Sequence, residues 1–363
     1  MTDEYRAQAD ALDARVLAAI AEARLDDAAF DALACAIFAH QFRWNAPYAA
    51  FARSRGIDEN TLPLRALDIP AVPAAAFKDA VLCTVPAERA ATWFETSGTT
   101  QTRSGRHYLE SPTLYERALL RGFDRALLAD GARLRYLNLV PNPRQRPHSS
   151  LGFMMDVVAR ERGDGATGWF LDAEHLDATA FCGAVEQAAA AGMGVCIATT
   201  AFALVALLDE IAERGLDATV PPGSRVMETG GFKGRSRIVE RDELYARAAA
   251  AFGIPTSAVV AEYGMTELSS QYYDSPASRR QSRRIKEPVP WLRPVVVDTD
   301  GRPLPDGIVG TIRHIDCANR SSVIAVDTED LGAIVDGGLL LLGRDADATL
   351  RGCSLDAEDL VRG

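Results

Sequence analysis

The sequence predicts an α/β protein, with a mostly parallel, helix-covered sheet followed by a small antiparallel β subdomain. Between residues 90 and 270, short apolar runs alternate with segments of helical periodicity, which is typical of a parallel sheet. After about residue 288, β-rich runs are separated by Asp-Gly pairs, which favour hairpins. With 48% hydrophobic and 25% charged residues, the composition is that of a globular protein and excludes a disordered or collagen-like chain.

The first elements in chain order are helices within residues 1–55, where Phe30, Leu33 and Ile37 lie on one helical face. A proline-punctuated connector at residues 69–73 leads towards a short strand at residues 93–95. The parallel sheet has expected strands at residues 134–140, 169–171, 195–198, 226–228 and 258–263. Its helices are expected near residues 112–129, 149–161, 177–191, 201–214 and 239–252. The β subdomain has expected strands at residues 294–298, 310–315, 322–326 and 339–342.

These elements predict three segments. Residues 1–287 form an α/β core with a helical N-terminal part, and residues 288–343 form a β-rich subdomain of the same core. Residues 344–363 form a short tail that bears Cys353.

Charge and cysteine usage narrow the class of protein further. The net charge of −11 argues against nucleic acid as the main partner. No run of about 18 apolar residues predicts a membrane span, and the acidic N-terminus is unlike a signal peptide, so we expect a cytoplasmic protein. The six cysteines lack metal-binding spacing, so all except Cys353 are expected to be buried, reduced and inert. The three lysines are Lys78, Lys233 and Lys286.

The strongest local motif is a loop rich in serine, threonine and glycine that follows the strand at residues 93–95. Its backbone N–H groups and hydroxyls suit phosphate oxygens, and an arginine adds positive charge. The candidate phosphate-binding residues are Thr96, Ser97, Gly98, Thr99, Thr100 and Arg103. The alternative is a solvated turn; the loop is not a P-loop, because no Gly-Lys-Ser/Thr follows.

A second motif ends the strand at residues 258–263. Tyr263 can stack on a nucleobase, Gly264 lets the backbone approach a ligand, and Thr266 can bind phosphate. Glu267 can hold Mg²⁺ through its carboxylate. The alternative is a helix start capped near Thr266, with a buried tyrosine.

Two further motifs complete the set. Asp330 and Arg344 can bind the hydroxyls of a ribose. Gly230 and Gly231, after the strand at residues 226–228, can pack their backbone against a flat base. Taken singly, Asp330 and Arg344 are more readily explained as ordinary turn residues.

Together and in this order, the four motifs resemble those of the ANL superfamily of adenylate-forming enzymes. There the hydroxyl-rich loop handles the ATP phosphates, Tyr-Gly-x-Thr-Glu binds adenine, α-phosphate and Mg²⁺, and Thr-Gly-Asp with Gly-Arg holds the ribose. Glu329 departs from that pattern, since it replaces the glycine. Four stretches narrow the resemblance to the acyl-protein synthetase (LuxE) family: residues 69–78, 96–100, 147–151 and 229–234.

The resemblance implies an ANL-type N-terminal core without the usual separate C-terminal ligase domain, because only 19 residues, none of them lysine, follow Arg344. It places Cys353 where such synthetases carry the acyl group on a cysteine. It places His148 beside the carboxylate to be activated, with a structural hydrogen bond as the alternative. It also makes Lys233 a candidate for binding phosphate or carboxylate.

The implied enzyme is an AMP-forming, acyl-activating ligase that uses ATP and Mg²⁺. It would activate a carboxylic acid, a fatty acid by resemblance, as an acyl-adenylate, transfer the acyl group to Cys353, and pass it to an acyl carrier protein or acyl reductase. The basic run at residues 279–286 is either a solvated loop or the docking patch for that partner. One alternative is direct transfer to coenzyme A, a carrier-protein thiol or an amine. Another is a non-catalytic nucleotide-binding protein of the same fold.

Overall fold

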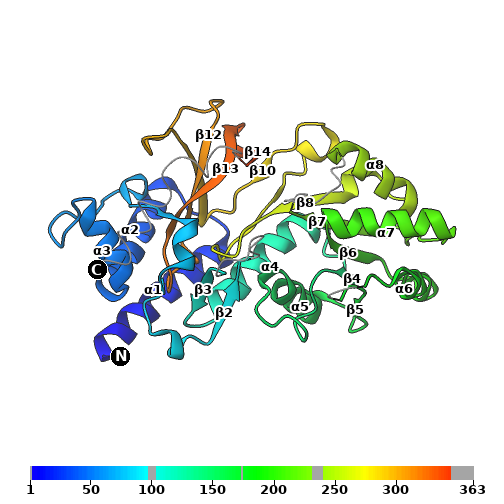
Figure 1. Ribbon diagram of the computed structural model, residues 1–363, viewed down its shortest axis with the longest axis horizontal. Helices are drawn as coiled ribbons and strands as arrows, with labels where there is room; N and C mark the ends of the chain where they lie inside the picture. Colours follow the sequence, from blue (N-terminus) through cyan, green and yellow to red (C-terminus); the bar gives the residue numbers. More distant parts are fainter. Residues whose placement is uncertain (1, 97–103, 173–174, 231–239, 345–363) are drawn as a thin grey trace. The chain divides into compact units, whose positions relative to one another are not determined.

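A computed structural model of the chain describes residues 2–96, 104–172, 175–230 and 240–344 (Figure 1). The chain divides into two compact units, each made of segments that are distant in sequence. The first unit comprises Met1–Arg121, Met265–Gln271 and Glu287–Gly363. The second comprises Gly122–Gly264 and Tyr272–Lys286.

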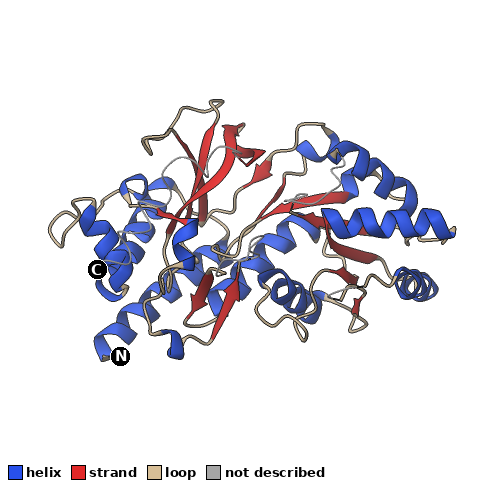
Figure 2. Ribbon diagram, viewed as in Figure 1, coloured by secondary structure: helices blue, strands red, loops and turns tan. Residues whose placement is uncertain are grey.

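The second unit contains the predicted parallel sheet, drawn as red arrows in Figure 2. Its strands are β4 (Arg135–Leu139), β5 (Gly168–Trp169), β6 (Val195–Thr200), β7 (Arg225–Thr229), β8 (Val259–Tyr263) and β9 (Tyr272–Asp274). They lie in the order β5-β4-β6-β7-β8-β9. The first five run parallel, and β9 pairs antiparallel with β8. The carboxyl ends of β7 and β8 therefore lie side by side.

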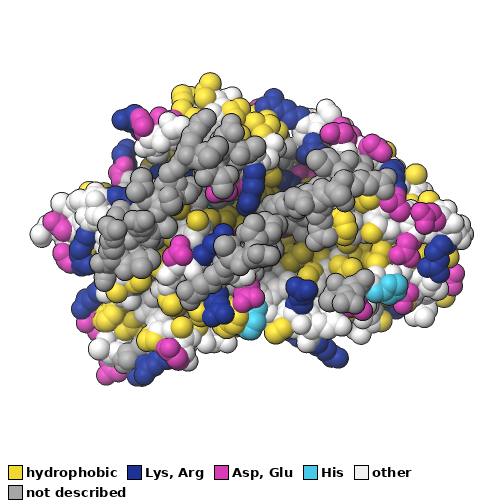
Figure 3. Space-filling view, viewed as in Figure 1, with side chains coloured by type: hydrophobic (Ala, Val, Ile, Leu, Met, Phe, Trp, Pro, Cys, Tyr) yellow, Lys and Arg dark blue, Asp and Glu magenta, His cyan; other side chains and the backbone are white. Residues whose placement is uncertain are grey.

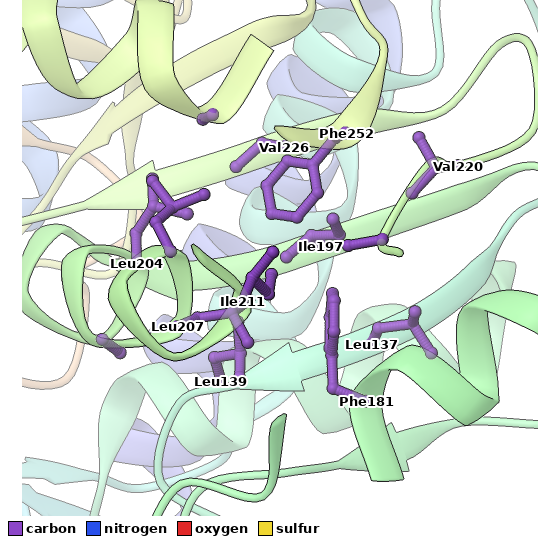
Figure 4. Packing of buried hydrophobic residues seen from close by; sticks show 14 of the residues in the cluster. Leu137, Leu139, Phe181, Ile197, Leu204, Leu207, Ile211, Val220, Val226 and Phe252 are labelled. Carbon is purple, nitrogen blue, oxygen red and sulfur yellow. The ribbon is translucent and has the colours of Figure 1, made fainter. Parts of the chain in front are cut away.

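Helices cover this sheet on both faces. Those of the unit are α5 (Ser150–Arg162), α6 (Ala178–Ala190), α7 (Ala201–Arg214) and α8 (Arg241–Phe252), with the short 3₁₀ helices η4 (Thr256–Ala258) and η5 (Ser278–Arg280). Leu137 and Leu139 of β4 face a buried cluster that includes Phe181 of α6 and Ile211 of α7 (Figure 4). Because side chains alternate along a strand, Tyr136 points to the opposite face, where its ring centroid lies 6.0 Å from that of Phe123.

The turn from β4 into α5 shows how local sequence shapes this unit. Ser149 caps α5 by accepting a hydrogen bond from the Gly152 amide at 3.1 Å. A Cβ atom at Gly152 would lie 2.4 Å from the Pro141 carbonyl oxygen, so only glycine fits there. His148, one residue before the cap, is thereby held in this turn.

The first unit combines helices with an antiparallel sheet. Its helices are α1 (Asp3–Glu22), α2 (Asp27–Trp44) and α3 (Ala46–Ser54), with η1 (Ala66–Asp68), η2 (Ala74–Lys78) and η3 (Ala87–Arg89). Strands β11 (Leu292–Val297), β12 (Gly310–Asp316), β13 (Ala325–Val335) and β14 (Gly338–Arg344) pair antiparallel in that order, and β1 (Val72–Pro73) joins β13 in parallel. A separate hairpin consists of β2 (Thr92–Glu95) and β3 (Arg106–Leu109). Helix α4 (Thr113–Leu127) and strand β10 (Lys286–Glu287) span the divisions between the units.

Buried polar contacts fasten the N-terminal helices to the rest of the first unit. Arg320 is 3% exposed and donates to both carboxylate oxygens of Asp13 on α1, at 2.6 and 2.9 Å. It also donates to Glu110 at 2.5 Å. Gln41 of α2 donates to the Asn319 carbonyl at 2.8 Å. The helical N-terminal segment is thus bonded to the loop between β12 and β13.

The fold class predicted from the sequence is confirmed, with one local correction. The strand expected at residues 322–326 instead runs over Ala325–Val335, so Thr328, Glu329 and Asp330 lie within β13 and not in a turn. Thr328 and Asp330 are satisfied there, because the Thr328 hydroxyl donates to the Ile312 carbonyl and Asp330 accepts from Arg344 of β14. The predicted segment boundaries at residues 287 and 343 stay predictions. No helix in the described ranges is long and apolar enough to cross a membrane.

Candidate functional site

The predicted phosphate-binding loop connects β2 to β3, and Thr96 closes its base. The Thr96 amide donates to the Gly105 carbonyl at 3.0 Å, and the Gly105 amide donates to the Thr96 hydroxyl at 2.9 Å. A Cβ atom at Gly105 would lie 3.2 Å from both the Thr96 hydroxyl and the backbone of Phe77, so glycine permits this closure. Ser97, Gly98, Thr99, Thr100 and Arg103 lie outside the described residues.

In the same unit, the Thr266-Glu267 part of the second motif lies against this hairpin. The Thr266 hydroxyl donates to the Glu95 carbonyl at 3.4 Å, at the end of β2. His107 of β3 donates from Nδ1 to the Thr266 carbonyl at 2.7 Å. Glu267 is 7% exposed, and its carbonyl accepts a hydrogen bond from Asn319 at 2.8 Å. Two motifs separated by some 160 residues thus meet at the base of one loop.

The predicted ribose-binding residues also come together. Asp330 and Arg344 face each other across β13 and β14, and Arg344 Nε lies 3.0 Å from Asp330 Oδ1. The Asp330 amide donates to the Thr328 hydroxyl, and that hydroxyl donates to the Ile312 carbonyl. Gly343 has φ +117°, a backbone conformation that favours glycine just before the arginine. Asp330 is buried, at 8% exposed, while the side chain of Arg344 is exposed.

In the second unit, the remaining motifs lie at the carboxyl ends of β7 and β8, the edge where parallel sheets bind ligands. Tyr263 ends β8, and its ring centroid lies 5.8 Å from that of Tyr272. Gly230 follows β7 with φ +75°. The Thr229 hydroxyl donates to the Glu262 carboxylate and links the two strand ends. Gly264 follows directly in the chain, while Gly231 and Lys233 lie outside the described residues.

A buried carboxyl that the sequence analysis missed lies behind these strand ends. Glu228 of β7 is 6% exposed and accepts a hydrogen bond from the Tyr245 hydroxyl at 2.8 Å. Its other oxygen, Oε1, has no hydrogen-bond partner among the described residues. Burial raises the pKa of Glu228 to about 7. Its only signal in the sequence is a charged residue in an apolar strand.

The basic run at residues 279–286 is not a patch of five exposed charges. Arg284 and Lys286 are buried and share Asp274, with contacts of 2.9 and 3.0 Å. Arg279 donates to the backbone carbonyls of Asp274 and Ala126. On the face drawn in Figure 3, basic and acidic side chains are interspersed. Three of the five charges therefore serve the fold of the second unit.

The predicted metal ligand, Glu267, lies among the described residues. Across residues 2–96, 104–172, 175–230 and 240–344, no group of three or more His, Cys, Asp or Glu side chains is arranged to hold an ion. A single carboxylate nonetheless fits Mg²⁺, which usually binds one or two carboxylates together with substrate phosphates. Glu267 is compatible with that role.

Comparison with known proteins identifies the family. The sequence model of the acyl-protein synthetase family LuxE matches residues 7–360. The chain belongs to this family. No curated protein matches the sequence significantly.

Solved structures similar to this LuxE-family chain include adenylate-forming enzymes. An open conformation of 2-hydroxyisobutyryl-CoA ligase, in complex with its acyl-adenylate and CoA, has a TM-score of 0.64 and 14% identity, over 87% of this chain and 70% of that one. ATP-bound MatB from Rhodopseudomonas palustris has a TM-score of 0.52 and 18% identity, over 72% of this chain and 49% of that one. The amide bond synthetase McbA from Marinactinospora thermotolerans has a TM-score of 0.50 and 19% identity, over 73% of this chain and 52% of that one. This chain spans about half the length of the latter two, and its fold is that of the ANL core.

The predicted recognition is therefore confirmed, while the individual site residues stay predictions. The structure describes the residues at the loop base, the strand ends, the strand pair and the turn from β4 into α5: Thr96, His148, Gly230, Tyr263, Gly264, Thr266, Glu267, Asp330 and Arg344. Cys353 lies outside the described residues, as do Lys233 and most of the hydroxyl-rich loop. The predicted absence of a separate C-terminal domain also stays a prediction.

Proposed function

We propose that this LuxE-family protein activates a carboxylic acid with ATP and carries the acyl group on Cys353 before passing it to a partner. The observation that carries the proposal is the family match over residues 7–360. The placement of Tyr263 and Gly264 at a strand end and of Thr266 and Glu267 against the hydroxyl-rich hairpin supports it. The ATP-bound MatB neighbour supports the use of ATP.

The first half-reaction overcomes the poor reactivity of a carboxylate. The carboxylate oxygen attacks the α-phosphorus of ATP, a P–O bond forms, and pyrophosphate leaves with its electron pair. The resulting acyl-adenylate has AMP as a good leaving group. The protein has to position the reactants and stabilise charge at phosphorus. Thr266 would bind the phosphate, and Glu267 would hold Mg²⁺, which neutralises phosphate charge.

The second half-reaction needs a thiolate, and the described cysteines are poor candidates. Burial raises the pKa of Cys35 and Cys83 to about 11 and that of Cys196 to about 12. Burial also raises the pKa of Cys182 and Cys317. Thiols with a raised pKa are mostly protonated at neutral pH and do not attack efficiently. This favours Cys353, whose thiolate would attack the acyl carbon and release AMP.

A second candidate is direct transfer of the acyl group to coenzyme A, a carrier-protein thiol or an amine. One of the similar solved structures is a CoA ligase in complex with an acyl-adenylate and CoA, and another is an amide bond synthetase. Both fates begin with the same adenylate. They differ only in whether an enzyme-bound acyl group precedes the product.

Exchange of radioactive pyrophosphate into ATP tests the first half-reaction. Exchange should require an acid, and a panel of fatty, short-chain and aromatic acids ranks the substrates. Cys353→Ser should retain exchange and lose the hydroxylamine-labile acyl label, whereas the control Cys35→Ser should retain both. Label that persists in Cys353→Ser contradicts the cysteine assignment, and wild-type protein that supports exchange but takes up no acyl label favours direct transfer. ATP binding without exchange for any acid contradicts catalysis and favours a nucleotide-binding protein.

The final acceptor is tested with the labelled protein. We propose an acyl carrier protein or an acyl reductase as the partner. Mixing acyl-labelled protein with each purified candidate should move the label to the true acceptor. Transfer to free coenzyme A at an equal rate would contradict a protein partner.

A further inference from the structure

Two consecutive carbonyl groups in the second motif are each held by a buried side chain from a distant part of the same unit. His107 Nδ1 donates to the Thr266 carbonyl at 2.7 Å. Asn319 Nδ2 donates to the Glu267 carbonyl at 2.8 Å. His107 is 0% exposed and Asn319 is 1% exposed, so water does not compete for these two donors.

These two carbonyls belong to the peptide planes on either side of Glu267. Fixing both planes fixes the backbone dihedrals of Glu267, and with them the direction of its Cα–Cβ bond. We propose that His107 and Asn319 are positioning residues that hold Glu267 in register with the hydroxyl-rich hairpin for binding Mg²⁺·ATP. This inference rests on the proposed function of the motif and adds the residues that set its geometry.

The histidine is suited to act as a fixed neutral donor. It lies on β3, where it pairs with Phe94 of β2, and its ring packs edge-on against Phe77 at 5.7 Å. Burial lowers the pKa of His107 to about 4, so the neutral ring carries its single proton on Nδ1, facing the Thr266 carbonyl. Nε2 has no hydrogen-bond partner among the described residues, so the Thr266 contact is the polar contact that the structure shows for this ring.

The asparagine is fixed in turn by its own contacts. Its Nδ2 also donates to the Val323 carbonyl at 3.1 Å, and its Oδ1 accepts from the Ser269 hydroxyl at 2.6 Å. Asp316 accepts from the Ser269 amide and the Ser270 hydroxyl just beyond the motif. The segment after Glu267 is thus hydrogen-bonded at successive residues. These bonds limit the freedom of the Glu267 carboxylate.

Titration calorimetry of Mg²⁺·ATP with the full chain tests the proposal without requiring turnover. His107→Leu removes the donor at similar volume and should weaken Mg²⁺·ATP binding by about 10- to 100-fold, the usual cost of losing an outer-shell contact. His107→Asn places an amide N–H near the Nδ1 position and should restore binding to within about threefold, while His107→Gln places it near Nε2 and should not. Asn319→Asp should weaken binding as His107→Leu does.

Tyr48→Phe is the matched control, because it removes one buried hydrogen bond to a carbonyl, that of Pro70 at 2.7 Å, elsewhere in the same unit. Tyr48→Phe should lose about as much thermal stability as His107→Leu, yet leave Mg²⁺·ATP binding unchanged. In the exchange assay, His107→Leu should raise the KM for ATP and for Mg²⁺ and leave the KM for the acid unchanged. If His107→Leu does not fold, the comparison of His107→Asn with His107→Gln decides.

Equal binding by His107→Asn and His107→Gln, or equal losses in Tyr48→Phe and His107→Leu, would overturn the positioning role. Such results would leave the proposed function intact, since wild-type exchange is measured independently. Wild-type protein that binds no Mg²⁺·ATP would overturn both proposals.

Discussion

Replacing Glu228 with glutamine should change how the stability of the protein depends on pH. Glu228 is buried, and Tyr245 donates to one of its oxygens while the other has no partner among the described residues. Burial is the largest cause of its raised pKa. Asp274 and Glu262 add to it, and the Tyr245 hydrogen bond and Lys286 oppose it. The folded protein therefore holds this proton at a pH where an unfolded chain has released it.

The size of the effect follows from the two pKa values. Between 4.5 and about 7, the folded state binds a proton that the unfolded state does not, so stability falls as pH rises through this window. From pH 5 to pH 8 the wild-type protein loses about 2.5 kcal/mol through this one group. Glutamine keeps an acceptor for Tyr245 and does not titrate, so the variant does not show this loss.

Urea denaturation at pH 5, 6, 7 and 8 measures the difference between variant and wild type. The free energy of unfolding of Glu228→Gln, relative to wild type, should rise by about 2.5 kcal/mol across that range. Glu213→Gln, on the exposed side of α7, removes the same charge and controls for the change in net charge. A difference that is constant with pH, or that grows as pH falls, would refute the assignment of a buried, protonated Glu228.

Three further outcomes are expected. Asp274→Asn leaves Arg284 and Lys286 buried without their carboxylate and should lower the free energy of unfolding by about 3–5 kcal/mol in urea; a loss below about 1 kcal/mol would contradict the buried triad. Asp330→Asn should raise the KM for ATP about tenfold, more than Arg344→Gln because Arg344 is exposed, and an equal rise in the KM for the acid would argue against a ribose contact. Chelating divalent ions should abolish pyrophosphate exchange and added Mg²⁺ should restore it, whereas exchange that persists in excess chelator would exclude Mg²⁺.

Local patterns were sufficient to predict most of the elements. The strand expected at residues 226–228 is β7, and the helix expected at residues 201–214 is α7. Asp336 and Gly337 both adopt positive φ between β13 and β14, as the Asp-Gly hairpin signal predicts. Strand β13 was underestimated because polar residues interrupt its apolar run, and their ion pairs become visible only when β12 and β14 lie beside it.

The candidate site was predicted in its parts but not in its connections. The motifs could be identified because phosphate, base and ribose each require particular residue types close together in sequence. The contacts between His107 and Thr266, or Asn319 and Glu267, join residues far apart in the chain and leave no periodic signal. The sequence does not distinguish a buried histidine or asparagine from an exposed one.

By itself, the sequence determined the alternation of strands and helices, the turn positions and the order of the motifs, because each depends on residues within a few positions of one another. The tertiary structure alone decided which charges became buried and which carbonyls they bind. It turned Arg284 and Lys286 from a surface patch into partners of Asp274, and it enclosed Glu228 beside Tyr245. The physical reason is that burial and partner choice depend on which distant segments pack together, and no local pattern encodes that choice.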